Sequence, residues 1–174
     1  MVRYIEEIMQ QDVVTVGPDT SVKELLRILV TNQISGVPVV SEAGEILGVV
    51  STTDVIRLGA QEAELPRGTL SWEPLAVPDE EFDEDSAASF FMVSEDWRYP
   101  TEDQTKAIPD GSFEGVSVGD IMTSAAFTVG PRDTVGAVAK FLLQGRIHRA
   151  LVVEGDRLRG IVTAFDLLKA FVED

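Results

Sequence analysis

The sequence predicts an α/β (α+β) protein with two β-α-β-β-α repeats packed around a pseudo-twofold axis and a long insertion between them. Three observations support this prediction. One stretch of sequence recurs at a fixed offset. Each copy alternates strand-type and helix-type hydrophobic patterns. The negative charge of the chain is concentrated between the two copies.

The repeat is visible by direct alignment. "IMQQDVVTVGPDTSVKELLRILVTNQISGVPVV", which begins at Ile8, aligns without a gap with "IMTSAAFTVGPRDTVGAVAKFLLQGRIHRALVV", which begins at Ile121. One residue is lost in the next turn, and "LGVVSTTDVI" then matches "RGIVTAFDLL". Equivalent residues are therefore 113 positions apart before this turn and 112 positions apart after it. Neither copy is large enough to bury a hydrophobic core that would make it stable alone, so we expect the two to pack together.

Within each copy the pattern predicts the elements in order. β-branched runs at residues 12–16 and 126–129 predict short strands, which Gly-Pro pairs end. A helix follows, because Ser21 and Glu24 have the spacing of a capping box and the next apolar residues have helical spacing. Two strands around a turn and a short second helix complete each copy. The apolar helical positions of the first copy are Val22, Leu25, Leu26, Leu29 and Val30.

The middle of the chain differs from the repeats in composition. Residues 59–118 contain 15 acidic and 3 basic residues, in a chain whose net charge is −16. The predicted domains are therefore residues 1–58 and 118–174, separated by an acidic insertion at 59–117. The insertion also holds both tryptophans, whereas disordered acidic segments are usually poor in aromatic residues. We expect part of it to dock on the repeats or on a second chain; the alternative is a long, mostly disordered insertion.

Composition excludes several classes of function. The chain has no cysteine, which excludes disulfides and thiol catalysis, and its one histidine leaves few groups for a nucleophile with a base or for a metal site. We therefore expect no enzymatic activity and no metal. No apolar run approaches a membrane span of roughly 18 residues, and no signal peptide is recognisable, so we expect a soluble cytoplasmic protein with no membrane partner. The net negative charge disfavours nucleic acid as a partner.

Each repeat places a hydroxyl residue three positions before an aspartate, as Ser51 with Asp54 and as Thr163 with Asp166. Two interpretations fit this motif. The carboxylate could accept the hydroxyls of a ribose, with the hydroxyl residue and the amides of a helix N-terminus seating a phosphate. Alternatively, the hydroxyl residue is a helix N-cap, and the aspartate stabilises the positive end of that helix. Repetition does not separate the two interpretations, because both copies need a helix start.

The order of the motifs resembles a pair of cystathionine β-synthase (CBS) domains, which is called a Bateman module. The pattern is G-h-h-[ST]-x-x-D at the end of each copy, with "ISGVPVV" and "IHRALVV" before the last hairpin. The resemblance covers about residues 3–58 and 117–173. It implies two clefts, each able to take an adenosine-containing ligand such as AMP, ADP, ATP, NAD or S-adenosylmethionine. It also implies homodimerisation. No cofactor is required; the adenine nucleotide would be a regulatory ligand.

The resemblance also implies roles for the residues of the repeated motif. Asp54 and Asp166 would accept the ribose hydroxyls, and Ser51 and Thr163 would lie close to the ribose-phosphate. Thr52 adds a further hydroxyl in the first copy.

The polar pair His148 and Arg149 would reach the phosphates of the Asp54 cleft from the partner repeat. A guanidinium offers phosphate two parallel hydrogen bonds, and the histidine could donate one more. The equivalent residues of the first copy, Ser35 and Gly36, carry no charge, so we expect the Asp54 cleft to be the better phosphate site. The alternative is that these basic residues balance acidic neighbours on the surface.

Three residues before the helices are candidates for contact with adenine. Ala126 and Phe127 would flank the ring in the Asp54 cleft, and Val14 would do so in the other cleft. Strand residues of this kind are also common in a plain core. Leu151 departs from the family, which usually has proline there, so the path of the second copy could differ.

The leading functional hypothesis is a stand-alone sensor. An adenine nucleotide would bind between the repeats, shift the population of module shapes, and pass the signal to an unknown protein partner. The alternative is a ligand-free dimeric scaffold that docks its partner through the acidic insertion.

Overall fold

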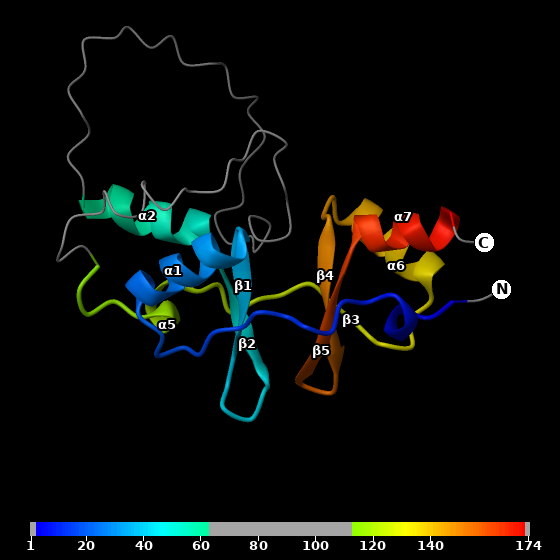
Figure 1. Cartoon of the computed structure of the whole chain (residues 1–174), viewed down its shortest axis with the longest axis horizontal. Coiled ribbons are helices and arrows are strands. Elements are labelled where there is room, and N and C mark those ends of the chain that lie inside the picture. The colour runs from blue at the N-terminus through cyan, green and yellow to red at the C-terminus, as the bar shows by residue number, and fades with distance from the viewer. Residues whose placement is uncertain (1–2, 63–112, 173–174) are drawn as a thin grey trace, which may run out of the picture.

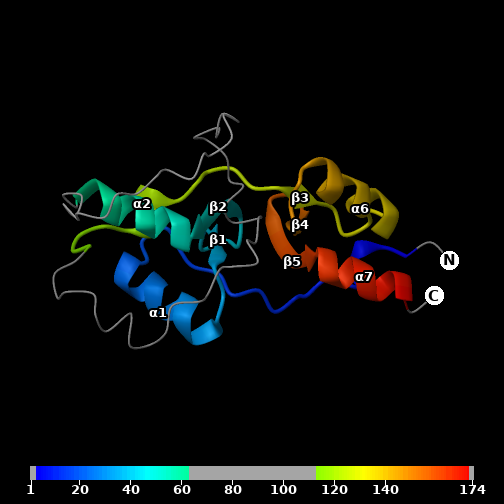
Figure 2. The same ribbon diagram turned by 90° about the horizontal axis from the view of Figure 1, so that it is seen from above.

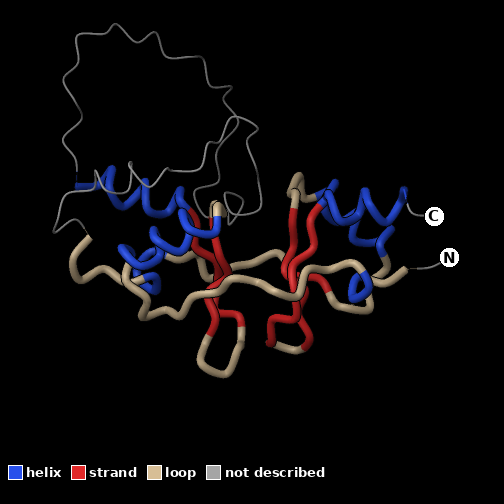
Figure 3. Tube along the Cα trace, viewed as in Figure 1, coloured by secondary structure: helices blue, strands red, loops and turns tan. Residues whose placement is uncertain are grey.

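The computed structural model describes residues 3–62 and 113–172. Two β-hairpins stand side by side in the middle of the molecule, and the helices of each repeat cover its outer side (Figures 1 and 3). This is the predicted mixed α/β architecture of two β-α-β-β-α repeats. The aromatic and acidic insertion falls largely at residues 63–112, so the expectation that it docks lies outside the described residues, and the domain boundaries stay a prediction.

The elements follow the predicted order, except that the strand predicted at residues 12–16 of the first repeat is reduced to a single bridge at Val16. Each antiparallel hairpin is flanked by the helix before it and the helix after it, as Figure 2 shows from above. The first repeat contains the 3-10 helix η1 (Ile5–Glu7), α1 (Val22–Asn32), β1 (Gly36–Val40), β2 (Ile46–Ser51) and α2 (Thr52–Glu62). The second repeat contains α5 (Val118–Ile121), β3 (Thr128–Val129), α6 (Val135–Gln144), β4 (Arg149–Glu154), β5 (Arg157–Thr163) and α7 (Ala164–Val172).

The long helices begin at hydroxyl N-caps. The Ser21 hydroxyl accepts a hydrogen bond from the Glu24 N–H at 3.2 Å, and Thr134 caps α6 in the same way. The predicted capping box is only half formed, because the Glu24 carboxylate pairs with Arg27 at 3.1 Å instead of reaching back to the cap. An exposed ion pair of this kind contributes little, so the hydroxyl cap is the stabilising half.

A proline explains the main difference between the two sheets. In the second repeat, β3 pairs in parallel with β4, and the Leu151 N–H donates to the Phe127 carbonyl at 2.9 Å. In the first repeat Pro38 occupies the position of Leu151 and has no N–H to donate. The parallel pairing there shrinks to a single bridge between Val16 and Val39. The departure at Leu151 therefore lengthens the ladder of the second copy.

The two repeats exchange their lead-in segments. Gln10, which precedes the first repeat's helix α1, pairs with Ile161 of β5, with both backbone hydrogen bonds at 2.9 Å. Thr123, its equivalent in the second repeat, pairs with Val49 of β2 through two bonds of the same length. Each lead-in therefore adds a strand-like edge to the hairpin of the other repeat.

The pseudo-twofold axis passes between the turns of the hairpins. Glu45 and Arg157 occupy equivalent positions, and they form a bridge with each other. The Ile46 N–H donates to the Asp156 carbonyl at 2.9 Å, and this bond joins the backbones of the two turns. A contact between equivalent residues occurs only at a symmetry axis, so this bridge locates the axis.

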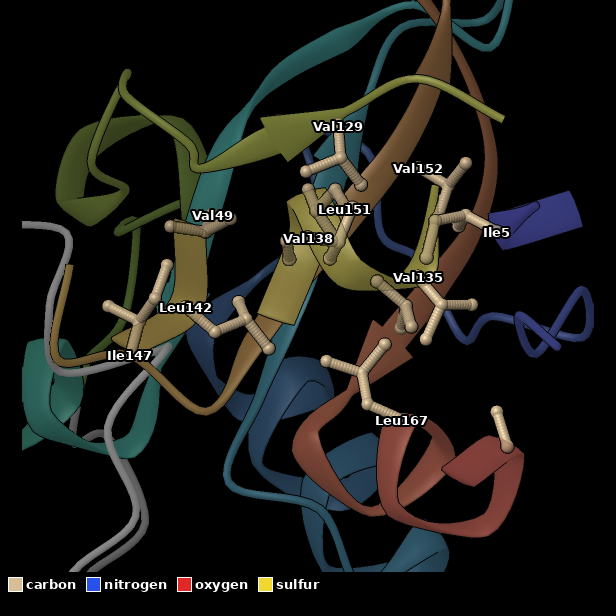
Figure 4. Packing of buried hydrophobic residues seen from close by; sticks show 13 residues of the cluster. Ile5, Val49, Val129, Val135, Val138, Leu142, Ile147, Leu151, Val152 and Leu167 are labelled. Atoms are coloured by element: carbon tan, nitrogen blue, oxygen red, sulfur yellow. The ribbon is translucent and has the colours of Figure 1, made fainter. Parts of the chain in front are cut away.

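The exchange extends to the hydrophobic cores. Ile5 of η1 is fully buried in the core of the second repeat, and its equivalent, Val118 of α5, is fully buried in the core of the first. Val49 of β2 also belongs to the second core, where Figure 4 shows it beside residues of α6. Removing either lead-in would therefore open the core of the other repeat.

Close backbone approach explains the glycine of the repeated motif. A Cβ on Gly48 would collide with the Thr123 carbonyl, and a Cβ on Gly160 would lie 2.7 Å from the Gln10 oxygen. Real Cβ atoms do not approach so closely, and the obstacle is backbone that is already paired. The glycines are required by the crossing of the lead-ins and not by turn geometry.

We predict that Gly48→Ala lowers the free energy of unfolding by about 1–3 kcal/mol, because the lead-in must move away from β2. Gly136→Ala is the control. Gly136 lies in α6 with nothing within 4 Å of an added Cβ, so alanine should stabilise this helix by roughly 0.5–1 kcal/mol. Urea unfolding of both variants measures the difference. Equal effects in the same direction would contradict the close approach.

Candidate functional site

The first repeated motif forms the start of α2. Ser51 ends β2 and is 1% exposed, and Asp54 is the third residue of α2 and is 7% exposed. Oδ2 of Asp54 accepts two hydrogen bonds of 2.7 Å, one from the Ser51 N–H and one from its hydroxyl. Among the described residues, no hydrogen bond to Oδ1 is found. One oxygen of this buried carboxylate therefore holds the helix start, and the other is not engaged by the part of the chain that the structure describes.

The second motif forms the start of α7 in the same way, with one difference. Oδ2 of Asp166 accepts from the Thr163 N–H at 2.9 Å and from its hydroxyl at 2.7 Å, and the Thr163 hydroxyl caps the Asp166 N–H at 3.3 Å. Oδ1 of Asp166 accepts a further hydrogen bond of 3.4 Å from the Gln10 side-chain amide. Both oxygens of this carboxylate are therefore engaged.

A cavity of about 600 Å³ opens beside Asp54. Helix α2 forms one wall, and the segment that leads into the second repeat forms the other. The cavity therefore lies where the exchanged lead-in passes the helix start. Its lining residues are Asp54, Arg57, Leu58, Gly115, Val116, Asp120, Ile121 and Thr123.

The cavity contains charges of both signs. Arg57 contributes a guanidinium, while Asp54 and Asp120 contribute carboxylates. The backbone N–H of Ser117 and then its hydroxyl donate to Oδ2 of Asp120 at 2.8 and 2.7 Å, and these bonds lower the pKa of the Asp120 carboxyl below its usual value. With two carboxylates and one guanidinium, the cavity favours a ligand of low negative charge.

Sequence reasoning did not find Arg57. It lies one helical turn after Asp54, so the two residues share a face of α2. The signal that could have identified it is this i, i+3 spacing of an acidic and a basic residue in the helix that follows the motif hydroxyl. A guanidinium at this place can bind a phosphate or a carboxylate group.

The predicted phosphate residues lie elsewhere in the fold. His148 is exposed, and its carbonyl accepts a hydrogen bond of 2.8 Å from the Ala164 N–H. Arg149 begins β4 opposite Thr163 and is half-buried. The described lining of the Asp54 cavity does not include either residue. Their assignment to the phosphates of that cleft stays a prediction.

The remaining polar candidates support the helix start of the first repeat. Gly36 pairs with Ser51 at the beginning of the hairpin. The carbonyl of Ser35 accepts a hydrogen bond of 2.9 Å from the N–H of Thr52, whose side chain is buried. This bond is the counterpart of the bond between His148 and Ala164. The structure therefore places Ser35 and Gly36 close to the Ser51–Asp54 motif.

The predicted adenine residues are half-buried and adjoin the cores. Phe127 packs edge-on against Phe141 of α6, with ring centroids 6.2 Å apart, and Ala126 packs on the same core. Val14 packs on the core of the first repeat. These contacts agree with the core interpretation, and a role in binding adenine stays a prediction for all three.

Two features of the described residues bear on other classes of function. No helix among them is long and apolar enough to cross a membrane. Within residues 3–62 and 113–172 there is no group of three acidic or histidine side chains that could hold a metal ion.

Two exchanged β-α-β-β-α repeats, each with an aspartate at the start of its last helix, define a tandem-repeat α/β module. The family model of the CBS domain matches residues 5–60 and 118–173. The chain therefore belongs to the CBS-domain family, with two CBS domains and an intervening region, as the resemblance predicted.

Known relatives match along nearly the whole chain. The chloroplastic CBS domain-containing protein CBSX1 of Arabidopsis thaliana is 28% identical over 165 residues, which are 94% of this chain and 61% of that protein. The chain thus spans less than two thirds of the length of CBSX1. The uncharacterized protein MJ1426 of Methanocaldococcus jannaschii is 26% identical over 98% of this chain and 92% of its own. A match to an inosine-5'-monophosphate dehydrogenase of Korarchaeum cryptofilum covers only 11% of that enzyme.

Solved structures share the fold. The crystal structure of CBSX2 in complex with AMP has a TM-score of 0.62 and 22% identity, and covers 98% of this chain and 96% of that chain. The CBS domain pair of MJ0100 in complex with 5'-methylthioadenosine and S-adenosylmethionine has a TM-score of 0.59 and 18% identity, and covers 99% of this chain and 98% of that chain. CBSX2 and the MJ0100 pair, which share this fold, are thus seen with adenosine-containing ligands.

We predict that Ser117→Ala raises the pKa of Asp120 part of the way to its usual value, because the hydroxyl donor is lost and the N–H donor stays. The lowered pKa means that this carboxylate stabilises the fold above its unfolded pKa, and that the contribution is lost as pH falls through the folded pKa. The variant should therefore lose less stability than the wild-type protein on acidification. An NMR titration of the carboxyl carbon measures the pKa directly, and an unchanged value would contradict the assignment.

Proposed function

We propose that the protein is a regulatory module that binds an adenosine-containing ligand beside Asp54. The observation that supports this proposal best is that the two oxygens of the Asp54 carboxylate differ. Oδ2 accepts hydrogen bonds from Ser51, while Oδ1 is not engaged by the described residues. The buried side chain borders a cavity of about 600 Å³, which is within the usual range for small-molecule sites. The AMP in the CBSX2 structure and the S-adenosylmethionine in the MJ0100 structure suggest the ligand class.

The proposed ligand contacts follow from the chemistry of the cavity. The ribose hydroxyls donate to Oδ1 of Asp54, as a carboxylate accepts a ribose in dinucleotide folds. Arg57 binds the phosphate from within the cavity, and Arg149 is the alternative that the family resemblance implies. Because Asp120 adds a second carboxylate, each further phosphate on the ligand adds repulsion. AMP should therefore bind more tightly than ATP.

The position of the cavity suggests how binding would become a signal. Its two walls are α2, which ends at Glu62, and the segment from Gly115 to Thr123. In the sequence these segments flank the acidic insertion on either side. A ligand that contacts both walls binds best to the conformation in which the two walls are close. It therefore shifts the population of the protein toward that conformation, by an amount set by the difference in its affinity for the two conformations. The signal would then pass to a partner protein, whose identity stays open.

We predict that AMP binds with an affinity on the order of micromolar and that Asp54→Ala weakens binding at least about 100-fold, because the ribose loses its acceptor. Arg57→Ala should weaken AMP about tenfold or more and leave adenosine unchanged. Titration calorimetry with AMP, ATP, adenosine and S-adenosylmethionine measures this, with Arg149→Ala as the matched comparison.

Loss of AMP binding in Arg149→Ala but not in Arg57→Ala would show that the pair His148 and Arg149 binds the phosphate instead of Arg57. If no ligand gives a heat of binding, the Asp54 motif serves only to start helix α2. That result would favour the second candidate, a ligand-free dimeric scaffold that docks its partner through the insertion.

We further propose that the module is a homodimer joined through its second repeat. Helices α6 and α7 pack together (Figures 1 and 2). Large apolar side chains of these two helices are exposed and form an apolar face. Side chains of this size expose on the order of 600 Å² together, close to the ~800 Å² that each partner buries in a standard interface. The face is formed by Leu143, Phe165, Leu168, Phe171 and Val172.

Charge and spacing favour a second copy on this face. Asp166 is the one acidic residue of these two helices, and it is buried, so an acidic chain can approach here with little repulsion. Two antiparallel α7 helices related by a twofold axis near Leu168 would place Phe165 of each copy against Val172 of the other. Thr53 and Gly59 occupy the positions of Phe165 and Phe171 in the first repeat, which therefore has no comparable face.

We predict that Leu168→Glu weakens the dimer at least about 100-fold, because two charges meet near the axis in place of two buried leucines. Ile56→Glu is the matched control. Ile56 is the equivalent residue of α2 and is 57% exposed, against 58% for Leu168, and its substitution should leave the dimer intact. Sedimentation equilibrium measures both variants. Equal dissociation would show that second repeats pair with first repeats, and a monomeric wild-type protein would rule out the dimer.

A further inference from the structure

The two helix starts are equivalent by the repeat, but their surroundings differ. Gln10 occupies the position of Thr123, and Arg3 occupies that of Val116. Thr123 and Val116 are small, and both line the cavity beside Asp54. The place beside the second aspartate that corresponds to this cavity, the second cleft that the family resemblance implies, therefore has two long polar side chains where the first cleft has short ones.

Gln10 is held where its side chain reaches Asp166. Its backbone N–H and carbonyl both pair with Ile161 at 2.9 Å, in the same register as Thr123 with Val49. From this fixed position the side-chain amide donates to Oδ1 of Asp166 at 3.4 Å. This is the oxygen whose counterpart in Asp54 faces the proposed ribose. Threonine, with its shorter side chain, does not make this contact at the equivalent place.

Arg3 borders the same cleft from the other side. Its Nη1 donates to the carbonyl of Ala170 at 3.2 Å. Ala170 is the counterpart of Leu58, a lining residue of the first cavity. The arginine therefore joins the beginning of the chain to α7 across the cleft, where the first repeat has a valine.

We propose that Gln10, supported by Arg3, is the residue that closes the second cleft, so that each chain binds one adenosine-containing ligand. The inference rests on the proposed function of the Asp54 cleft. A ribose entering beside Asp166 must displace an amide that is tethered next to the carboxylate and competes at a high effective concentration. Replacing one hydrogen bond to a charged group by another gains little, so the second cleft should bind at least about tenfold more weakly.

The repeat supplies its own reciprocal experiment. Gln10→Thr gives the second cleft the residue of the first, and Thr123→Gln gives the first cleft the residue of the second. Both substitutions keep the backbone pairing, because only side chains change. Titration calorimetry of the full chain with AMP measures the stoichiometry and the affinity of each variant, and thermal unfolding checks that each is folded.

The expected result is one AMP per wild-type chain, with binding lost in Asp54→Ala and retained in Asp166→Ala. Gln10→Thr should gain a second AMP, whose binding is lost when Asp166→Ala is added. Thr123→Gln should weaken the first site at least tenfold.

Three outcomes would overturn the inference, and they are distinguishable. Two AMP molecules of similar affinity per wild-type chain would show that Gln10 does not close the cleft. One AMP in both the wild-type chain and Gln10→Thr, with an unchanged affinity in Thr123→Gln, would show that this position does not control access. In both cases the proposed function would stand. No AMP binding to any variant would overturn the proposed function and this inference with it.

Discussion

The structure depends on the exchange of lead-in segments between the repeats. Ile5 completes the core of the second repeat, and Val118 completes the core of the first. Neither repeat is therefore a self-sufficient domain, although each is contiguous in sequence. The exchange is possible because Gly48 and Gly160 let a backbone pass where a Cβ would collide. Two adjacent hairpins bridged at Glu45 and Arg157 then follow from the symmetry of the exchange.

The candidate site is a product of the same exchange. Asp54 belongs to the first repeat, whereas Thr123 opposite it belongs to the lead-in of the second. The cavity thus lies between chain segments that are far apart in sequence and are brought together only by the crossing. The pseudo-symmetry makes two such places, and single substitutions then make them unequal. Threonine leaves space at one, and glutamine contacts the carboxylate at the other.

Local pattern predicted the repeat, the order of elements and the hydroxyl cap of α1, because periodicity and capping are encoded in neighbouring residues. It could not predict which hairpin each lead-in joins, since pairing between distant segments leaves no local period. The short pairing at Val16 depends on Pro38, which lacks the N–H that a tertiary pairing needs. The half-formed capping box has a local cause, because Arg27 of the same helix pairs with the Glu24 carboxylate. Arg57 was missed because the family resemblance directed attention to His148 and Arg149.

The repeated motif shows why local chemistry left two interpretations open. Helix capping and ribose binding would use the same carboxylate, but a carboxylate has two oxygens and about four acceptor positions. The two roles therefore do not exclude each other. In Asp54 the cap uses Oδ2, and in doing so it fixes the orientation of a carboxylate that lines the cavity. A ligand would then meet an acceptor that is already ordered and buried, so little side-chain entropy remains to be lost on binding. Under the proposed function, the helix cap therefore preorganises the ribose acceptor, and the two interpretations are compatible in a single carboxylate.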